Sequence, residues 1–134
     1  MVESSQLGQW RSLVATINLN QTNATYTLAT ATGDVVIDPR QCSWYVDVAA
    51  AAPLTSVSIV TNSTTVNTLL TVAEGVVANL VAQATLSPAN VKPFILRSGK
   101  LLQYIIAGGV GGTGSQITVE IMYKPLGAGS GVLS

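Results

Sequence analysis

The strongest constraint on the fold is an alternation of apolar and polar residues that recurs along the chain. Residues 11–19 show it with Leu13, Ala15, Ile17 and Leu19 on one side and Ser12, Thr16 and Asn18 on the other. A two-residue period is typical of a strand with one face in the core and one in solvent. Several such one-sided segments are buried most simply between two antiparallel sheets.

Further strands are predicted at residues 25–31, 35–38, 43–49, 54–61 and 116–124. In the first of these, Tyr26 and Leu28 fall on one face; in the fourth, Val57 and Ile59 do. Residues 101–108 are apolar on both faces, which predicts a central strand covered on both sides. About eight strands separated by turn residues predict an all-β fold, an antiparallel β-sandwich or jelly roll.

Residues 69–84 break the two-residue period. Their apolar positions approach a helical spacing, and Thr71 with Glu74 has the form of a capping box, which favours a short helix around residues 69–80. Gly75 and the valine-rich composition favour instead two strands joined by a turn at Glu74-Gly75. Both interpretations stay open at the level of sequence.

The length of 134 residues predicts one domain. We assign residues 10–126 to a β-sandwich domain, residues 1–9 to an N-terminal arm and residues 127–134 to a C-terminal tail, unless a partner pins these ends. The sequence starts without a basic region and long apolar run, and it contains no apolar stretch of about 18 residues. We therefore expect a soluble protein made in a cytoplasm, with no membrane partner.

Only 9% of the residues are charged, six basic and six acidic. A balanced charge does not supply the basic surface that binding to phosphate backbones requires, so nucleic acid is not expected as a partner. Soluble small domains usually carry about 25–35% charged residues on their surfaces. The low value predicts that part of the surface is buried against copies of this chain or another protein, and a cyclic homo-oligomer, dimer or trimer, is the default.

The chain has no histidine and one cysteine, Cys42, which excludes histidine-dependent triads, histidine metal sites and disulfide frameworks. We expect Cys42 to be a small buried side chain. Residues 109–114 match the G-x-G-x-x-G pattern, but a strand follows where a nucleotide site needs a helix, so a glycine loop between neighbouring antiparallel strands is the better interpretation. No cofactor and no metal are expected.

The carboxylates offer no recognisable catalytic pair: Glu3, Asp34, Asp38, Asp47, Glu74 and Glu120. Asp34 and Asp38 flank a short strand beside Gly33 and Pro39, which favours turn chemistry over metal binding. Four aromatic side chains would be available for a carbohydrate platform, but in a β-rich chain such residues are usually in the core or at an interface: Trp10, Trp44, Tyr45 and Tyr104.

Residues from about Thr55 to Leu126 resemble head decoration, or cement, proteins of tailed bacteriophages. The shared features are a Leu-Leu-x-x-Ala-x-Gly segment, a Leu-x-x-Gly-Lys turn at residues 96–100, an apolar strand, an Ala-Gly-Gly loop and the closing Tyr123-Lys124-Pro125-Leu126. These are packing and turn features. The resemblance covers the C-terminal two-thirds of the domain, and residues 1–50 add little to it.

The resemblance implies a β-sandwich without enzymatic activity that binds the outer surface of a phage head, commonly as a trimer. Its partners would be other copies of itself and the major capsid protein, and its place the exterior of the virion, after synthesis in the host cytoplasm. The family supplies no site residues, so contact candidates come from the sequence alone. We select Gln9, Trp10 and Arg11, where an apolar side chain beside an arginine ends a polar arm.

Two other classes stay as alternatives. A carbohydrate- or receptor-binding module of a phage fibre or tail would use the same sandwich with an exposed aromatic side chain beside amides. A small hydrolase or isomerase would have to work with carboxylate, lysine, tyrosine or serine groups only, which makes it the weakest of the three.

Overall fold

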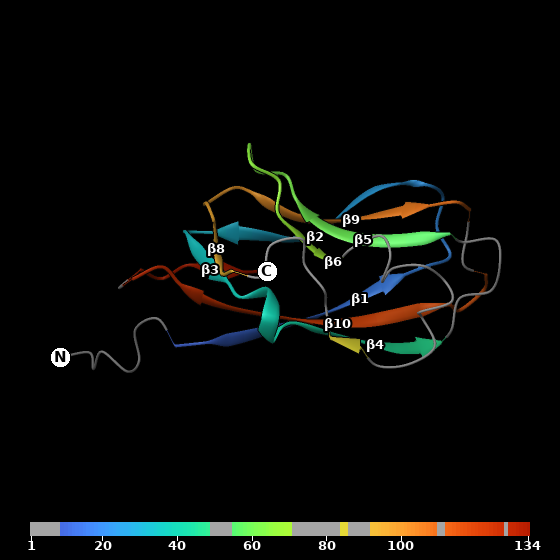
Figure 1. The fold of residues 1–134 in the computed structure, drawn as a ribbon, viewed down its shortest axis with the longest axis horizontal. Coiled ribbons are helices and arrows are strands. Elements are labelled where there is room, and N and C mark those ends of the chain that lie inside the picture. Colours follow the sequence, from blue (N-terminus) through green and yellow to red (C-terminus); the bar gives the residue numbers. More distant parts are fainter. Residues whose placement is uncertain (1–8, 49–54, 71–83, 86–91, 110–111, 128) are drawn as a thin grey trace.

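Two antiparallel sheets face each other in the computed structural model, which describes residues 9–48, 55–70, 84–85, 92–109, 112–127 and 129–134 (Figure 1). Their elements are β1 (Arg11–Asn18), β2 (Ala24–Thr32), β3 (Val35–Ile37), the 3-10 turn η1 (Pro39–Gln41), β4 (Ser43–Val48), β5 (Ser56–Thr61), β6 (Thr68–Leu70), β7 (Ala84–Thr85), β8 (Phe94–Leu96), β9 (Leu101–Ala107), β10 (Gln116–Pro125) and β11 (Val132–Leu133). The predicted all-β sandwich is confirmed.

The strand order is that of a jelly roll. In the first sheet β1 lies on one side of β10, while β3 and β4 share the other side, with β8 beyond β3 and β7 beyond β4. In the second sheet the order is β11-β2-β9-β5-β6. β3 and β4 lie end to end in one strand position beside β10, and β7 and β8 lie end to end in the next. The strands before β11 therefore occupy eight positions, four in each sheet, as in a jelly roll made of two Greek keys.

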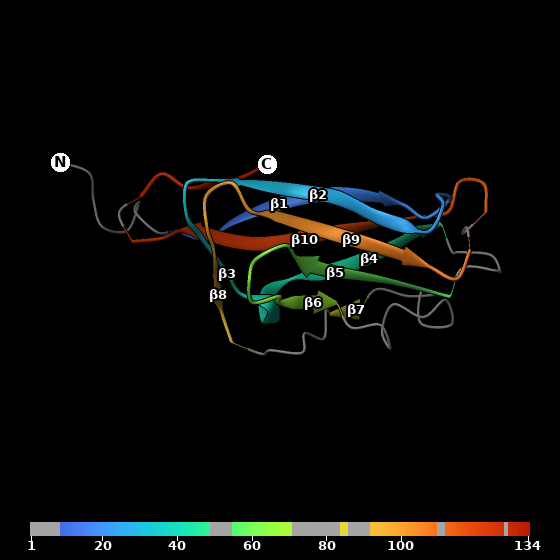
Figure 2. The ribbon, with the colours of Figure 1, turned by 90° about the horizontal axis from the view of Figure 1, so that it is seen from above.

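Seven of the ten connections between successive described strands lead from one sheet to the other. Figure 2 shows the result from above: β1 and β2 lie at one margin of the sandwich, and β6 and β7 at the other. The glycine loop after β9 is one of these crossings. It therefore joins strands of different sheets and not, as the sequence suggested, neighbouring strands of one sheet, because the neighbours of β10 are β1, β3 and β4.

The predicted alternation is confirmed most clearly in β10, which is buried at every second residue. Its inward side chains pack with those of β1 and β5 in one core. The fully buried core side chains on these three strands, each 0% exposed, are Ile17, Val57, Ile59, Ile117, Val119 and Ile121. The central position of β9, between β2 and β5, is also confirmed, but only one of its faces is buried and the other is half-exposed.

Tyr26 and Leu28 both pack against the core, as expected for one face of β2, but the two-residue period does not continue beyond Leu28. The pairing with β9 shifts between Thr27 and Ala29, so Leu28 is an extra residue in a β-bulge. Before the bulge the half-buried Tyr26 stacks on Tyr104, and after it Ala29 is the fully buried residue. A bulge adds one residue to one strand and so exchanges the inward and outward positions beyond it, which a strict two-residue pattern cannot register.

The first and last residues of the segment 69–84 are in strands. Leu69 and Leu70 belong to β6, which pairs with β5, and Ala84 belongs to β7, which pairs with β4. A helix beginning at Leu69 is therefore wrong. Residues 71–83 lie outside the described residues, as does most of the predicted N-terminal arm.

The C-terminal residues are not a free tail. β11 adds to the edge of β2, and Ser134 exchanges two backbone hydrogen bonds with Thr30 (2.7 and 3.0 Å). Leu133 is buried in the core. The backbone of Gly131 runs so close to that of Asp34 that a Cβ on Gly131 would overlap the carbonyl oxygen of Asp34. Residues 131–134 are held in place by contacts within this chain, with residues about 100 positions earlier in the sequence. Such distant contacts cannot be recognised from the local sequence.

Leu133 should therefore contribute to global stability although it lies one residue from the last. Replacing Leu133 with Ala should lower the free energy of unfolding by about 2–4 kcal/mol, because it leaves a cavity in the core. Its neighbour Val132 is 39% exposed, and Val132→Ala should cost less than about 1 kcal/mol. Urea denaturation of the two variants compares them directly, and equal small losses would show that β11 is not part of the cooperative fold.

Candidate functional site

The three predicted contact residues lie at the start of β1, at the end of the sandwich where β10 finishes. Gln9 and Arg11 are exposed and Trp10 is half-buried. The Nζ atom of Lys124, on β10, lies 5.1 Å from the centre of the Trp10 ring, a cation–π contact. Trp10 is therefore held against the outer face of the first sheet, and only part of it is available to a partner.

Further cations lie at the same end. The turn between β8 and β9 carries Arg97 and Lys100, both exposed, beside the turn between β2 and β3. Arg97 pairs with Asp34 (2.9 Å), and the backbone N–H of Ser98 donates to the same carboxylate (2.9 Å). We call this surface the Trp10 end, defined by Trp10, Arg11, Arg97, Lys100 and Lys124.

Sequence reasoning selected Trp10 and Arg11 but missed the other three residues of the Trp10 end. The register of β1 on β10 sets Arg11 opposite Tyr123, which brings Trp10 to Lys124. Sequence separation of more than 110 residues hides this pairing. The basic residues in the turn before β9 were visible, but only the fold brings them to the start of β1.

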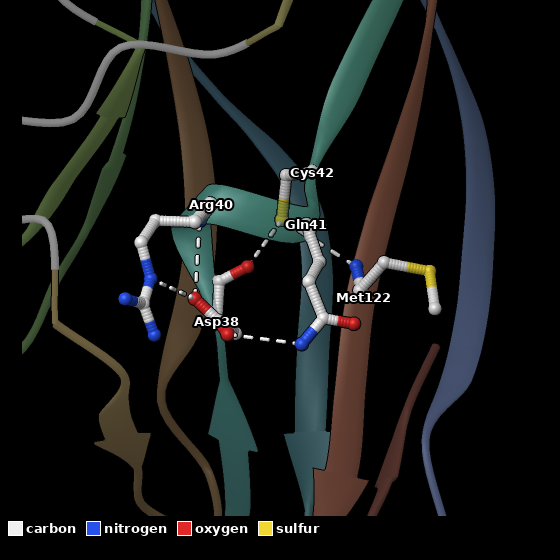
Figure 3. Close-up of polar contacts among 5 residues, drawn as sticks. All are labelled: Asp38, Arg40, Gln41, Cys42 and Met122. Atoms are coloured by element: carbon white, nitrogen blue, oxygen red, sulfur yellow. Dashed lines mark hydrogen bonds and ion pairs between the residues drawn. The ribbon is translucent and has the colours of Figure 1, made fainter.

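A 3-10 turn interrupts the strand beside β10 and carries a cluster of polar contacts around Asp38. Ile37 lies opposite Tyr123, and Ser43 lies opposite Glu120. The chain therefore advances six residues from Ile37 to Ser43 while β10 advances only three, so three residues are inserted. These are Pro39–Gln41, the turn η1. Figure 3 shows how Asp38 holds the turn, with its carboxylate between Arg40 and Gln41.

Cys42 closes the gap that η1 leaves in the sheet. The backbone N–H of Met122, which has no strand partner there, donates to the Sγ atom of Cys42 (3.4 Å), and the thiol donates to the carbonyl oxygen of Asp38 (3.3 Å). Cys42 is buried, as predicted. Burial raises the pKa of its thiol to about 11, so the group stays protonated and unreactive near neutral pH.

Asp38 is ionised within this cluster. Burial by itself would raise the pKa of its carboxyl group, but hydrogen bonds from Gln41, from the side chain and backbone of Arg40, and the charge of Arg40 outweigh burial and lower it. The pKa of Asp34 is also lowered, first by the hydrogen bond from the Ser98 backbone and then by Arg97. Both aspartates are confirmed as turn residues, and these contacts account for their position without a ligand.

The aromatic side chains do not form a common platform. Trp44 is fully buried and Tyr104 is 8% exposed, so both belong to the core. The Nε1 atom of Trp44 has no hydrogen-bond partner in the described ranges. Tyr45 lies on the outer face of the first sheet, where it accepts a hydrogen bond from Ser43 (3.3 Å). In the described ranges, no three histidine, cysteine or acidic side chains come together as a metal site.

No protein-family model and no curated protein matches this sequence. The chain is similar to a chain in the acidic stable capsid structure of Helicobacter pylori bacteriophage KHP30, with 18% sequence identity, a TM-score of 0.48, and coverage of 96% of this chain and 98% of that one. At this level of similarity the match assigns no function. None of the described segments forms a helix with the length and apolar character that a bilayer crossing needs.

Asp38 should make the stability of the fold depend on pH. Because its folded pKa lies below the reference value of 3.8, the carboxylate stabilises the fold above about pH 4, and this contribution is lost as the pH falls through the folded pKa. Asp38→Asn should lower the free energy of unfolding by about 1–3 kcal/mol at pH 7, with a smaller difference from the wild type at pH 2.

Urea denaturation from pH 2 to pH 7 measures this difference. Gln41→Ala, which removes one donor and keeps the carboxylate, is the matched control and should retain the pH dependence. A loss in Asp38→Asn that is the same at both pH extremes would show that the charge of Asp38 does not stabilise the turn.

Proposed function

We propose that this chain is a structural protein of a tailed-bacteriophage virion that binds the outer surface of the head and stabilises it, as a decoration or cement protein. It acts as a homo-oligomer, for which the family resemblance favours a trimer, and its other partner is the major capsid protein. It has no catalytic activity in this role. A protein that binds only the assembled shell stabilises that shell by mass action, and many copies multiply a modest energy per site.

The first support is the sequence resemblance, whose features have clear structural roles. The turn before β9 is closed by a hydrogen bond from the Lys100 backbone N–H to the Arg97 carbonyl oxygen (3.0 Å). In the Ala-Gly-Gly loop, Gly108 has a φ of 86° and lies where a Cβ would overlap Thr55. Both features shape the ends of the sandwich, where a jelly roll presents its loops.

The observation that carries the proposal is the Trp10 end. Four of its five defining residues are basic, although the chain as a whole has no net charge, and one of the four, Arg97, is paired with Asp34. An aromatic ring backed by a lysine and flanked by exposed arginine and lysine side chains suits an acidic protein surface, since arginine and tryptophan are enriched at interface hot spots. We infer that the Trp10 end contacts the major capsid protein.

The carbohydrate-binding alternative has less support. Two of the four aromatic residues that it would use, Trp44 and Tyr104, are in the core. The alternative of a small hydrolase also has less support. Two of the carboxylates that a hydrolytic site could use, Asp34 and Asp38, are already hydrogen-bonded within turns.

Co-sedimentation tests the proposal. The purified chain is mixed with expanded heads, lacking decoration protein, of the phage that encodes it. We expect saturable binding at a fixed number of copies per capsid subunit and a higher temperature of head disruption. Absence of binding to mature heads, together with retention on a glycan array, would reject the proposal in favour of the carbohydrate-binding module.

Trp10→Ala should weaken binding to heads by about tenfold or more, because an aromatic anchor contributes about 1–2 kcal/mol or more at an interface. Trp10→Phe keeps a ring over Lys124 and should retain most of the affinity. Higher salt should weaken wild-type binding, since the contact is partly ionic. Circular dichroism of each variant is the control: unfolding of Trp10→Ala would assign Trp10 to the core instead of the interface.

A further inference from the structure

β1 leaves a row of backbone hydrogen-bonding groups unpaired at the margin of the first sheet. The backbone N–H of Leu19 donates to the carbonyl oxygen of Ser115 (3.0 Å), which continues the β1–β10 ladder in the same register. In an antiparallel ladder the residues that bond the partner strand alternate with residues that point away. The N–H and C=O groups of Ser12, Val14 and Thr16 therefore point away from β10, and no described residue bonds them.

The free edge of β1 ends at Asn18, and it lacks the features that usually prevent pairing with another strand. At its C-terminal end the carbonyl oxygen of Asn18 already accepts a hydrogen bond from the Gln21 side chain (2.6 Å). Within β1 there is no proline, no bulge against β10 and no charge after Arg11. Proteins normally guard an exposed edge with one of these devices or with a very short strand.

Four other strands at the margins of the two sheets are short. β6 and β8 have three residues each, and β7 and β11 two each, whereas β1 has eight. Val14, in the middle of β1, is 60% exposed. β11 covers only Thr30–Thr32 of β2, so Ala24–Ala29 form a second open edge, which the bulge at Leu28 interrupts. β1 is the longest open edge without such an interruption in the part of the chain that the structure describes.

We propose that the free edge of β1 pairs with β1 of a second copy of this chain, antiparallel and about a two-fold axis at Val14. This register alone matches the three free residues of one copy with the same three of the other. Val14 then faces Val14 of the second copy, and Ser12 faces Thr16 in both directions. All three N–H and all three C=O groups of each edge are used, which makes six hydrogen bonds.

The side chains of β1 suit this register. Ser12, Val14 and Thr16 all lie on the outer face of the first sheet, so the pairing sets an apolar valine contact between two serine–threonine pairs. The inward residues of the two copies also stay on one face, because paired residues of an antiparallel ladder share a face. The two Arg11 side chains lie about 20 Å apart along the strands, too far for strong repulsion.

The β1 pairing specifies one contact within the homo-oligomer of the proposed function, and in this respect it rests on that function. A two-fold contact cannot close a ring of three chains. An assembly that contains both this contact and a three-fold contact must have an even number of chains. Because the contact forms between free chains in solution, it is tested without capsids, and its failure is distinguishable from a failure to bind heads.

Cysteine cross-linking at the two-fold axis tests the pairing. Directly opposed residues in such a ladder have Cα atoms about 5.5 Å apart, within the range of a disulfide. Val14→Cys should therefore form a covalent dimer under mild oxidation at low micromolar concentration. Val66→Cys is the control, because Val66 is 59% exposed, as much as Val14. Cys42 is buried and should not react.

A covalent dimer with Val14→Cys and not with Val66→Cys would support the pairing. Equal cross-linking of the two variants would show random collision and overturn it. An oligomer by light scattering that does not cross-link at position 14 would overturn the β1 contact and leave homo-oligomerisation standing. A monomer at all concentrations would overturn both the β1 contact and homo-oligomerisation, whatever the result of the binding experiment with heads.

Val14→Pro gives an independent measurement by sedimentation equilibrium. The N–H of Val14 points away from β10, so proline removes a donor from the free edge and none from the β1–β10 ladder. Two of the six hydrogen bonds disappear, and the dimer dissociation constant should rise by about thirtyfold. Val14→Thr, which keeps the backbone donor and a β-branched side chain, should change it by less than about threefold. Equal dissociation constants for the two variants would overturn the pairing.

Discussion

Strand β10 sets the geometry on which the rest of the structure depends. It pairs with β1 over eight successive residues on one side, and with β4 and then β3 on the other. These ladders fix which residues of three neighbouring strands face the core. They also create a mismatch of three residues beside Met122, which the protein resolves with η1. The Asp38 cluster and the Cys42 thiol supply the hydrogen bonds that a continuous strand would have made, so the interruption leaves few buried polar groups unsatisfied.

The same ladders bring together both surfaces that we assign a role. The register of β1 on β10 carries Trp10 to Lys124, and the turns that follow from the jelly-roll order bring Arg97 and Lys100 to that end. The opposite side of β1 is left with unpaired backbone groups at Ser12, Val14 and Thr16. One strand thus connects the proposed capsid contact, at its start, with the proposed contact between copies, along its edge. The low charge of the chain fits a molecule that covers part of its surface in this way.

Much of the fold could be predicted from the sequence because its long strands have one buried face. Alternating residues identify β1, β4, β5 and β10 with nearly correct ends, and turn residues separate them. The failures have specific causes. The bulge at Leu28 shifts the inward positions of β2 by one residue beyond it, to Ala29 and Ala31. β7 and β11 have two residues each, too few for a period to be recognised. Of the candidate site, Trp10 and Arg11 were accessible to sequence reasoning because an aromatic residue beside an arginine is conspicuous; Lys124, Arg97 and Lys100 were not.

The sequence by itself determined the all-β class, the absence of histidine chemistry and the burial of Cys42. These follow from composition and from local periodicity, which need no knowledge of distant contacts. Only the tertiary structure decided which strands are neighbours, where the three-residue insertion falls, that the C-terminal residues complete a sheet, and which edge is left open. Each of these depends on hydrogen-bond pairing between segments far apart in the chain, and the energy of a backbone pair is nearly independent of the side chains that it carries. Register is therefore chosen by the packing of the whole sandwich, not by either strand alone.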